Sequence, residues 1–372
     1  MKLNHLATLL SILLLNGCGM VGYYTQSVQG QLNILQLREP IDELIDSSTT
    51  PVELKEKLVQ IKEIRQFSIE KLHLPDNDSY LLYADVGQPY VVWNVFAAPE
   101  FSLTAKNWCY FIVGCVSYRG YFDKENAIEH ANLLTQQNYD VSVSGIAAYS
   151  TLGWFDDPVL NTMLNWREHH LAGLIFHELS HQVLYFKNET AFNEAFSTAV
   201  QRIATIQWLL TTNPEQISSY VEYLQAYQEF RALLKTTRAE LSLIYESELD
   251  EADKRHQKAA AILKMKKNYE ILKTTWPDNI SFDRWFSRPI NNSRFTSTMT
   301  YLEHVPAFFT LFYQANGDWN QFYETVKGFE DLEKEERDLQ IDALKINAPE
   351  IEKIIELLKT KSNYSAYFKK VQ

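Results

Sequence analysis

Residues 176–196 read FHELSHQVLYFKNETAFNEAF, and their spacing predicts two helices that face each other across a short turn. Apolar residues at Leu171, Leu174 and Ile175 lead into the first helix, so we expect it to be buried on most sides. The turn falls at residues 187–189, and the second helix should begin near Thr190. Polar side chains on the facing sides of the two helices would therefore lie close together.

Three of these polar side chains are candidate ligands of one metal ion. His177 and His181 are four residues apart, so both imidazoles share one face of a helix. The third ligand should come from another element, and Glu194 is the best-placed carboxylate. Glu189 competes with it, although a position in the turn favours solvent. Because a five-residue motif also arises by chance, the histidines could instead be core residues with ordinary polar partners.

Glu178 is the candidate catalytic residue of the HExxH motif. It lies one residue from the first ligand, close enough to contact water on a bound metal ion. Three protein ligands leave a fourth position for that water, so the pattern predicts Zn²⁺ with Glu178 as the general base. Asn193 is expected to orient Glu194 or a ligand histidine. His170, on the same helical face, could contact this site or the substrate, or could be an ordinary helix residue.

The N-terminus has the pattern of an export signal. Residues 1–17 read MKLNHLATLLSILLLNG, in which Lys2 precedes an apolar run too short to span a bilayer. Cys18 follows Leu-Asn-Gly, an arrangement that resembles the lipobox of bacterial lipoproteins. The resemblance implies a lipid anchor on Cys18 at the bacterial cell envelope. Since Gly19 follows rather than aspartate, we expect the outer membrane, facing the periplasm. The alternative is an ordinary signal peptide with an incidental cysteine.

Cys109 and Cys115 are the two other cysteines of the chain. An export signal implies an oxidising compartment, where two cysteines close in sequence can form a disulfide. A metal pair or two reduced thiols are the alternatives, although no further cysteine or histidine lies at zinc-finger spacing.

Helical periodicity dominates the chain, with one strand-rich segment. Residues 80–97 and 139–150 are predicted strands, so a small sheet should lie between residues 80 and 150. Residues 214–275 are predicted to form a long helical hairpin with its turn near 247–251. The other predicted helices cover residues 29–46, 51–72, 123–137 and 318–371. The fold class expected from the residues is an α-rich α+β fold, with residues 18–372 forming a single domain.

Composition excludes two broad classes of protein. Hydrophobic residues make up 46% of the 372 residues, which is enough for a large core and excludes disorder as the main state. The formal net charge is -12, whereas nucleic-acid-binding proteins usually carry a basic face. We therefore expect no nucleic-acid partner.

Several long stretches resemble a known bacterial family. They are GCGMVGYYTQSVQGQL (17–32), VVWNVFAAPEFSL (91–103), WCYFIVGCVSYRGYF (108–122), LGWFDDPVLNTM (152–163), HELSHQ (177–182), AFNEAF (191–196), NNSRF (291–295) and YLEHVPAF (301–308). Together they resemble the predicted-aminopeptidase lipoproteins across nearly the whole mature chain. The resemblance implies a zincin-like zinc metallopeptidase that acts on peptides. It also implies gluzincin-like ligands, His177, His181 and Glu194, with Glu178 as the catalytic base.

Two aspects of the predicted activity rest on weaker signals. Tyr301 is the first candidate for the donor that stabilises the oxyanion, and His304 is its rival. An aminopeptidase also needs a carboxylate that binds the substrate α-ammonium group. Glu100, Asp156 and Asp157 are candidates for that anchor, although each could be an ordinary loop or cap residue.

Three functions therefore remain open. The first is a zinc-dependent peptidase of the aminopeptidase type, and the second is a zinc endopeptidase that processes envelope proteins. The third is a non-catalytic envelope scaffold with a structural metal, which should have four protein ligands and no need for Glu178. The sequence does not indicate the natural substrate, the oligomeric state or the metal used in the cell.

Overall fold

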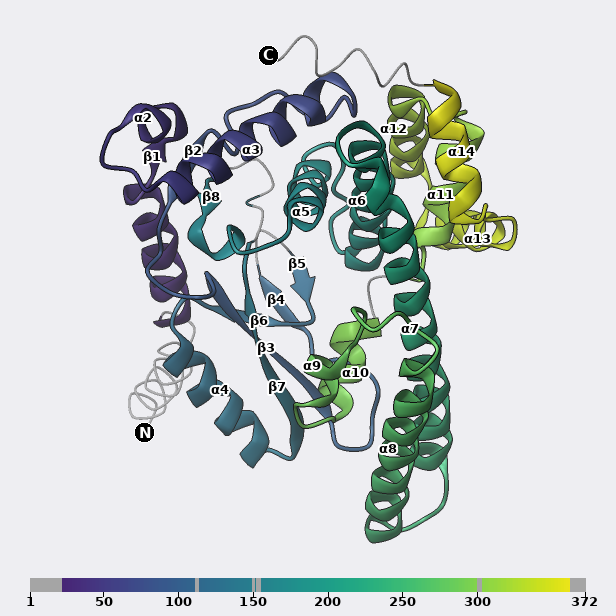
Figure 1. Ribbon diagram of the computed structural model, residues 1–372. Coiled ribbons are helices and arrows are strands. Elements are labelled where there is room, and N and C mark those ends of the chain that lie inside the picture. The colour runs from purple at the N-terminus through teal and green to yellow at the C-terminus, as the bar shows by residue number, and fades with distance from the viewer. Residues whose placement is uncertain (1–21, 111–113, 149–150, 152–154, 300–302, 362–372) are drawn as a thin grey trace, which may run out of the picture.

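The computed structural model describes residues 22–110, 114–148, 151, 155–299 and 303–361 (Figure 1). Helices dominate these residues and the sheets are small, so the predicted α-rich α+β class is confirmed. After a helix over residues 22–36, the main helices are α2 (Ile41–Asp46), α3 (Val52–Glu70), α4 (Lys124–Gln136), α5 (Glu168–Ser180), α6 (Thr190–Thr212), α7 (Ile217–Glu246), α8 (Glu251–Lys273), α9 (Asp283–Phe286), α10 (Asn292–Met299), α11 (Val305–Gln314), α12 (Trp319–Lys327), α13 (Lys334–Ile346) and α14 (Ile351–Lys361). None of the described helices is both long enough and apolar enough to cross a bilayer.

The helices α5 and α6 lie side by side at the centre of the largest core (Figure 1). Indole Nε1 of Trp208 donates a hydrogen bond to Glu168 at 3.0 Å, and His177 Nδ1 lies 3.1 Å from Gln201 Oε1. The residue nearer the start of α5 contacts the residue nearer the end of α6, and the reverse holds for the second pair. The two helices are therefore antiparallel, as the short turn between them predicted. A Cβ atom at Gly173 would lie 2.9 Å from Thr205 Oγ1, so the absent side chain lets the two helices approach closely.

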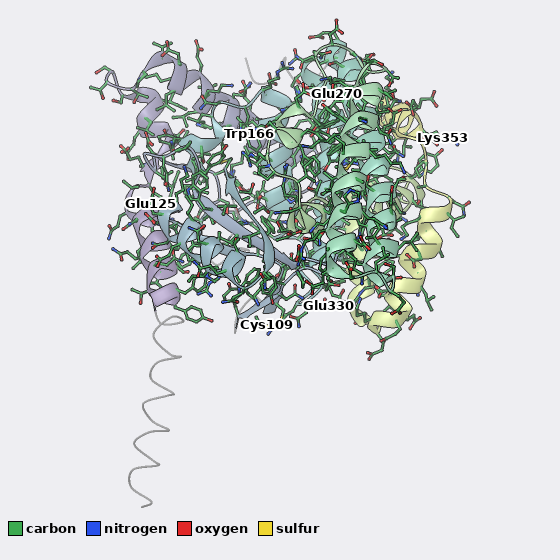
Figure 2. The ribbon with its side chains drawn as sticks, turned by 90° about the horizontal axis from the view of Figure 1, so that it is seen from below. Cys109, Glu125, Trp166, Glu270, Glu330 and Lys353 are labelled. Atoms are coloured by element: carbon green, nitrogen blue, oxygen red, sulfur yellow. A yellow bond between two sulfur atoms is a disulfide. The ribbon has the colours of Figure 1, made fainter. Side chains whose placement is uncertain are left out.

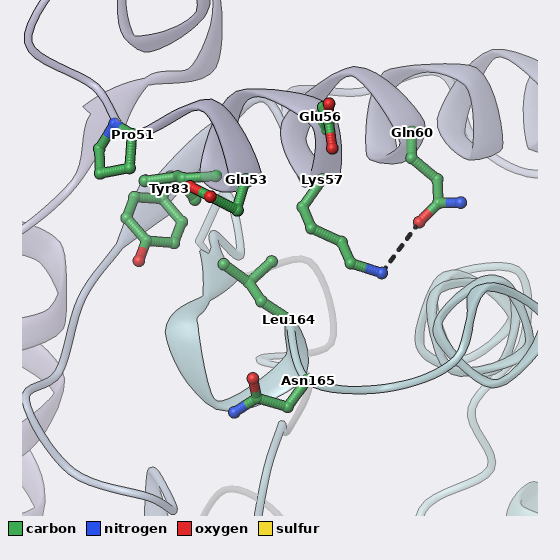
Figure 3. A pocket seen from close by; sticks show the side chains of 9 residues that line it. Pro51, Glu53, Glu56, Lys57, Gln60, Tyr83, Leu164 and Asn165 are labelled. Carbon is green, nitrogen blue, oxygen red and sulfur yellow. Dashed lines mark hydrogen bonds between the residues drawn. The ribbon is translucent and has the colours of Figure 1, made fainter.

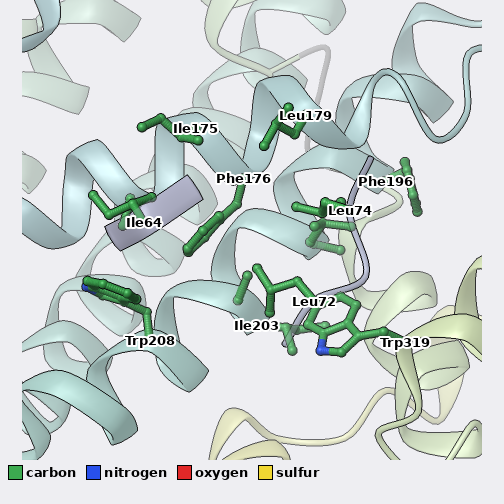
Figure 4. Packing of buried hydrophobic residues seen from close by; sticks show 14 of the residues in the cluster. Ile64, Leu72, Leu74, Ile175, Phe176, Leu179, Phe196, Ile203, Trp208 and Trp319 are labelled. Atoms are coloured by element: carbon green, nitrogen blue, oxygen red, sulfur yellow. The ribbon is translucent and has the colours of Figure 1, made fainter. Parts of the chain in front are cut away.

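The helix α3 and the C-terminal helices cover this central pair. Phe67 of α3 packs edge-on against Trp208 with the ring centroids 5.0 Å apart, and it also contacts Phe176 of α5. On another side, Phe196 of α6 packs against Phe308 of α11. Figure 4 shows Phe176, Phe196 and Trp208 among the apolar side chains packed around α5 and α6. The polar face of α5 is therefore held in a rigid apolar frame.

The strands form three small sheets rather than one. They are β1 (Glu39–Pro40), β2 (Leu82–Ala84), β3 (Val92–Pro99), β4 (Trp108–Tyr110), β5 (Gly114–Val116), β6 (Arg119–Tyr121), β7 (Tyr139–Ile146) and β8 (Val159–Leu160). The main sheet has the antiparallel order β6-β3-β7, and α4 packs against it. The order β1-β2-β8 joins the N-terminal part to the segment before α5, and β4 pairs with β5. Most of the strand residues lie between 80 and 150, as predicted.

The predicted helical hairpin is confirmed as α7 and α8, which project from the rest of the molecule in Figure 1. Asp250 ends the turn, because its side chain accepts a hydrogen bond from the backbone amide of Asp253 and so caps α8. The hairpin has an aromatic core of its own, in which Tyr269 stacks on Phe286 with the centroids 3.9 Å apart.

Three predicted helical segments differ in the structure. Residues 318–361 form the separate helices α12, α13 and α14, and the rest of the predicted segment 318–371 lies outside the described residues. The expected helix over residues 29–46 is interrupted by β1, because Pro40 has no amide hydrogen to continue the helical hydrogen bonds. The HExxH helix ends at Ser180, so His181 is its C-cap rather than an interior residue. The hydroxyl group of Ser180 donates to the carbonyl of His177 at 2.6 Å, which closes the last turn.

Candidate metal centre

His177, His181 and Glu194 meet at one point between α5 and the start of α6. One candidate ligand atom from each of these three residues lies within 4.8 Å of the other two. Nε2 of His177 is 3.4 Å from one carboxylate oxygen of Glu194, and Nε2 of His181 is 3.8 Å from the other. Among the described residues, this is the one group of three or more such side chains close enough to hold a metal ion.

The other nitrogen of each imidazole is held by a side chain of α6. Nδ1 of His177 lies 3.1 Å from the amide oxygen of Gln201, and Nδ1 of His181 lies 3.0 Å from the hydroxyl of Ser197. Glu194, Ser197 and Gln201 are three and four residues apart, so they share one face of α6. These partners turn both Nε2 atoms toward Glu194, the arrangement that ligand histidines need.

The charges in the site depend strongly on one another. Burial lowers the pKa of the His181 imidazole to about 4, and the charge of His177 lowers it further. Burial also acts to lower the pKa of His177, but its hydrogen bond with Glu194 and the nearby carboxylates raise it overall. For Glu194, burial acts to raise the pKa, and the hydrogen bond from His177 lowers it overall. The carboxylate of Glu194 is thus held in its charged form.

Glu178 lies beside this group and has a different environment. The residue is 8% exposed and accepts no hydrogen bond from any other residue in the described ranges. The pKa of its carboxyl group is raised to about 7, chiefly by burial and also by the charges of Glu194 and Asp157, against the opposing effect of His177. A buried carboxylate without a hydrogen-bond donor is costly, so this position is uncommon for a purely structural residue.

Tyr80 is a neighbour of Glu178 that the sequence did not indicate. It is 2% exposed, and its φ of 63° is in the left-handed region that tyrosine rarely adopts. Its backbone amide donates to the carbonyl of Asp157 at 2.7 Å. Burial raises the pKa of the Tyr80 hydroxyl, and the charges of Glu178 and Asp157 add to that rise. No local pattern around Tyr80 signals this strained backbone, which depends on the contact between distant segments.

Two predicted neighbours of the site have other roles. Asn193 was expected to orient a ligand, but its side chain binds the backbone of Phe186. Its Oδ1 atom accepts a hydrogen bond from the Phe186 amide at 2.8 Å, and its Nδ2 atom donates to the Phe186 carbonyl at 2.7 Å. It therefore holds the linker between α5 and α6. Glu189 forms ion pairs with Arg337 at 2.9 Å and Lys334 at 3.5 Å on α13, so it does not compete with Glu194. Gln201 and Ser197 hold the histidines in place of Asn193.

The three candidate anchors for the substrate ammonium group have different surroundings in the structure. Glu100 binds Arg255 of α8 through both carboxylate oxygens, at 2.7 and 2.8 Å. Asp156 is exposed, while Asp157 is buried and accepts hydrogen bonds from the amide and hydroxyl of Thr151. Of the three, Asp157 is the one whose charge acts on Glu178.

The remaining predicted residues lie elsewhere or outside the described ranges. His304 is the N-cap of α11, and the charged groups that act on its ring, apart from Glu303, are Lys345, Asp342 and Asp338 of α13. Tyr301 and Cys18 fall outside the described residues. Cys109 and Cys115 are joined by a disulfide where β4 pairs with β5, and Cys109 lies at the edge of the molecule in Figure 2.

A pocket of about 670 Å³ lies apart from these residues, between the start of α3 and the segment before α5. Figure 3 shows Lys57 and Gln60 on one wall and Leu164 and Asn165 on the other. None of the three candidate ligands lines it, so we do not assign it to the metal centre.

Comparison with known proteins places most of the chain in one family. Residues 22–341 match the family model described as "Putative aminopeptidase". No curated protein and no solved structure matches the chain. The matched region contains the whole candidate metal centre and the helical hairpin. The chain belongs to this aminopeptidase-like family, and that membership points to peptidase activity.

Proposed function

We propose that the protein is a zinc-dependent peptidase of the aminopeptidase type with a zincin-like site. His177, His181 and Glu194 would hold the metal ion, and Glu178 would act as the general base. The observation that carries the proposal is the buried Glu178 carboxylate, which lies beside the three ligands and has no hydrogen-bond donor among the described residues. Such a group is available to a water molecule or a substrate.

The donor set fits zinc. Two imidazole nitrogens and one carboxylate form a common set of ligands in catalytic zinc sites, and three protein ligands leave one position open. The depressed pKa of His181 favours its neutral form, which is the form that binds a metal. The lowered pKa of Glu194 keeps a negative charge opposite the cation.

The chain's own residues would then perform the proton transfers. A bound zinc ion would lower the pKa of water and polarise the scissile carbonyl. Glu178 would accept the proton of the attacking water on a carboxylate oxygen and then deliver it to the leaving amine nitrogen. Gln201 and Ser197 would keep both imidazoles oriented during this cycle. Tyr301 remains our candidate for the oxyanion donor.

We further propose that Cys18 carries the lipid anchor that holds this peptidase at the bacterial outer membrane, facing the periplasm. The apolar run before Cys18 and the lipobox-like segment support this location. Cys18→Ser should shift the protein from the membrane fraction to the soluble fraction. A protein that remains with the membranes in the Cys18→Ser variant would contradict the anchor.

The test of the enzymatic proposal uses the full chain in detergent. We expect one zinc ion per chain by elemental analysis and cleavage of a mixed peptide library, read by mass spectrometry. Glu178→Gln should keep the metal and lose at least about a hundredfold in rate. The exposed Glu129→Gln on α4 is the matched control and should retain activity.

The outcomes separate the candidate functions. Loss of single residues from the peptide N-termini would establish an aminopeptidase, whereas internal cuts would establish an endopeptidase. Bound zinc with equal inactivity of the wild type and Glu178→Gln would favour the scaffold. Absence of bound zinc would overturn the ligand assignment.

A further inference from the structure

A cluster of basic and aromatic side chains extends the face of α5 that carries the candidate ligands. His170 lies seven residues before His177 in α5, which is nearly two full turns, so the two share a face about 10 Å apart along the axis. The ring of His170 is exposed and packs against Tyr223 of α7 with the centroids 6.0 Å apart. Tyr223 in turn stacks on Tyr227, with the centroids 6.2 Å apart and the rings 15° from parallel.

Arg202 completes this cluster from α6. Its guanidinium group lies 5.7 Å from the centre of the Tyr227 ring. Arg202 directly follows Gln201, which holds the ligand His177. The four residues His170, Arg202, Tyr223 and Tyr227, here called the anion subsite, therefore join α7 to α5 and α6, the two helices that position the candidate metal ligands.

Within the described ranges, no residue neutralises the charge of Arg202. The side chain is partly buried, yet it forms no ion pair and no hydrogen bond with the residues that the structure describes. Acidic residues outnumber basic ones in the chain, 47 to 35, so carboxylate partners are abundant elsewhere. A partly buried guanidinium group that packs on an aromatic ring and has no described acidic partner is well suited to bind an external carboxylate.

A second arginine adds to the positive potential. Burial is the main reason for the lowered pKa of Arg231 on α7, and the nearby charge of Arg202 lowers it further against the effects of Tyr227 and Glu303. Like charges at close range favour an anion between or beside them. Arg202 and Arg231 thus share one positive region, whereas His170 is neutral near pH 7, because its pKa is lowered to about 4, chiefly by burial.

We propose that the anion subsite binds a carboxylate group of the peptide substrate, with Arg202 as the residue that determines this specificity. The inference rests on the proposed peptidase function and adds a substrate class to it. A peptide extends by about 3.3–3.6 Å per residue, so the spacing of about 10 Å between His170 and His177 along α5 corresponds to roughly three residues. The carboxylate could belong to an acidic side chain or to the peptide C-terminus about three residues from the cleaved bond.

Cleavage of decapeptide libraries by the full-length enzyme tests the proposal. We expect cut sites to have Asp, Glu or a free C-terminus two to four residues away. Arg202→Gln should reduce this preference about ten- to a hundredfold, since hydrogen bonds to charged groups are strong, while cleavage of neutral peptides continues. Arg202→Lys should keep part of the preference that Arg202→Gln loses. The exposed Arg284→Gln on α9 is the matched control and should keep the wild-type preference. Amidated libraries distinguish the C-terminus from acidic side chains.

A binding measurement keeps this test independent of hydrolysis. Fluorescent Ala/Leu decapeptides with one Glu are titrated into the Glu178→Gln protein, and the same peptides with Gln serve as the reference. Tighter binding of the Glu peptides that disappears with Arg202→Gln supports the anion subsite, even where no peptide is cut and the proposed function fails. Equal preferences of wild type and Arg202→Gln in both measurements would overturn the inference.

Discussion

At His177 and His181, hydrogen bonds to α6 decide which imidazole nitrogen faces Glu194. A histidine can present either nitrogen to a metal, and the partner of the other nitrogen fixes that choice. Gln201 is the stronger constraint, because its amide oxygen can only accept a hydrogen bond from Nδ1 of His177. Ser197 can either donate or accept, so it fixes His181 less strictly.

We therefore predict that Gln201→Met weakens metal binding with little change in fold. Methionine has a similar volume but cannot accept the Nδ1 hydrogen bond well, so His177 loses its orientation. Zinc affinity, measured by competition with a chromophoric chelator, should fall about ten- to a hundredfold. The exposed Gln340→Met on α13 should bind zinc like the wild type. Unchanged affinity in Gln201→Met would show that the helices alone orient the ligand.

His130 gives a second prediction, because it is a histidine that folding keeps neutral. The pKa of its imidazole is lowered to about 4, chiefly by burial and also by the charges of Arg119 and Lys106. The ring lies between Trp108 and Tyr121, and its buried Nε2 atom has no hydrogen-bond partner among the described residues. The unfolded chain binds more protons than the native protein between pH 6.5 and 4, so stability should fall as the pH decreases through that range.

Urea unfolding between pH 4 and 7.5 measures this effect. Relative to His130→Gln, the wild type should lose about 2 kcal/mol as the pH falls from 6.5 to 4, less than the full shift because the ring is only partly buried. The exposed His256→Gln on α8 serves as the control. Parallel curves for the wild type and His130→Gln would be incompatible with a buried neutral imidazole.

At the scale of elements, the linker between α5 and α6 is supported by the disulfide-bonded hairpin of β4 and β5. The backbone amide of Cys115 donates to the side chain of Asn188 at 3.4 Å. Gly114 has a φ of 78°, and a Cβ atom there would lie 2.1 Å from the Asn188 amide oxygen. The start of β5 thus fits against the linker only because Gly114 has no side chain.

Gly114→Ala should accordingly disturb both the fold and the metal site. The left-handed backbone alone costs about 1–2 kcal/mol for alanine, and the clash moves Asn188 in the linker that positions both ligand helices. We expect a lower urea midpoint together with weaker zinc binding. Gly328→Ala is the control, because a Cβ atom there meets nothing within 4 Å. A loss of stability with unchanged zinc affinity would show that the linker does not transmit the disturbance.

The elements differ in how well the sequence predicted them, for physical reasons. The hairpin of α7 and α8 carries local helical periodicity, and turn residues precede the start of α6 at Thr190, so the sequence located these elements. The end of α5 at Ser180 was missed, because the apolar residues after it continue to suit a helix. Gln201 and Ser197 follow Glu194 at helical spacing and could have been found, whereas Tyr80 depends on contacts between distant segments.

At the scale of the whole molecule, the described residues form three apolar cores, and polar contacts connect the two smaller ones. The largest surrounds α5 and α6, the second lies in the hairpin with α9 and α10, and the third lies between α4 and the main sheet. Lys258 of α8 donates to the carboxylate of Asp140 at 2.6 Å and to the carbonyl of Glu100 at 2.9 Å. Asn292 donates to the same two residues from the start of α10. The expected single domain depends on this junction.

Lys258→Met should therefore loosen the hairpin from the sheet. The side chains of Lys258 and Asp140 are 11% and 18% exposed, so removing the cation leaves a largely buried carboxylate without its main partner. Such a change costs roughly 3 kcal/mol. The control lies on the same helix: Lys264 pairs with Glu240 at the surface, and Lys264→Met should cost less than about 1 kcal/mol.

In urea, wild-type circular dichroism and tryptophan fluorescence should change together, whereas in Lys258→Met the two signals should separate as the hairpin core opens first. Equal losses in the two variants, with coincident signals in both, would mean that the apolar contacts of α10 hold the hairpin without this ion pair.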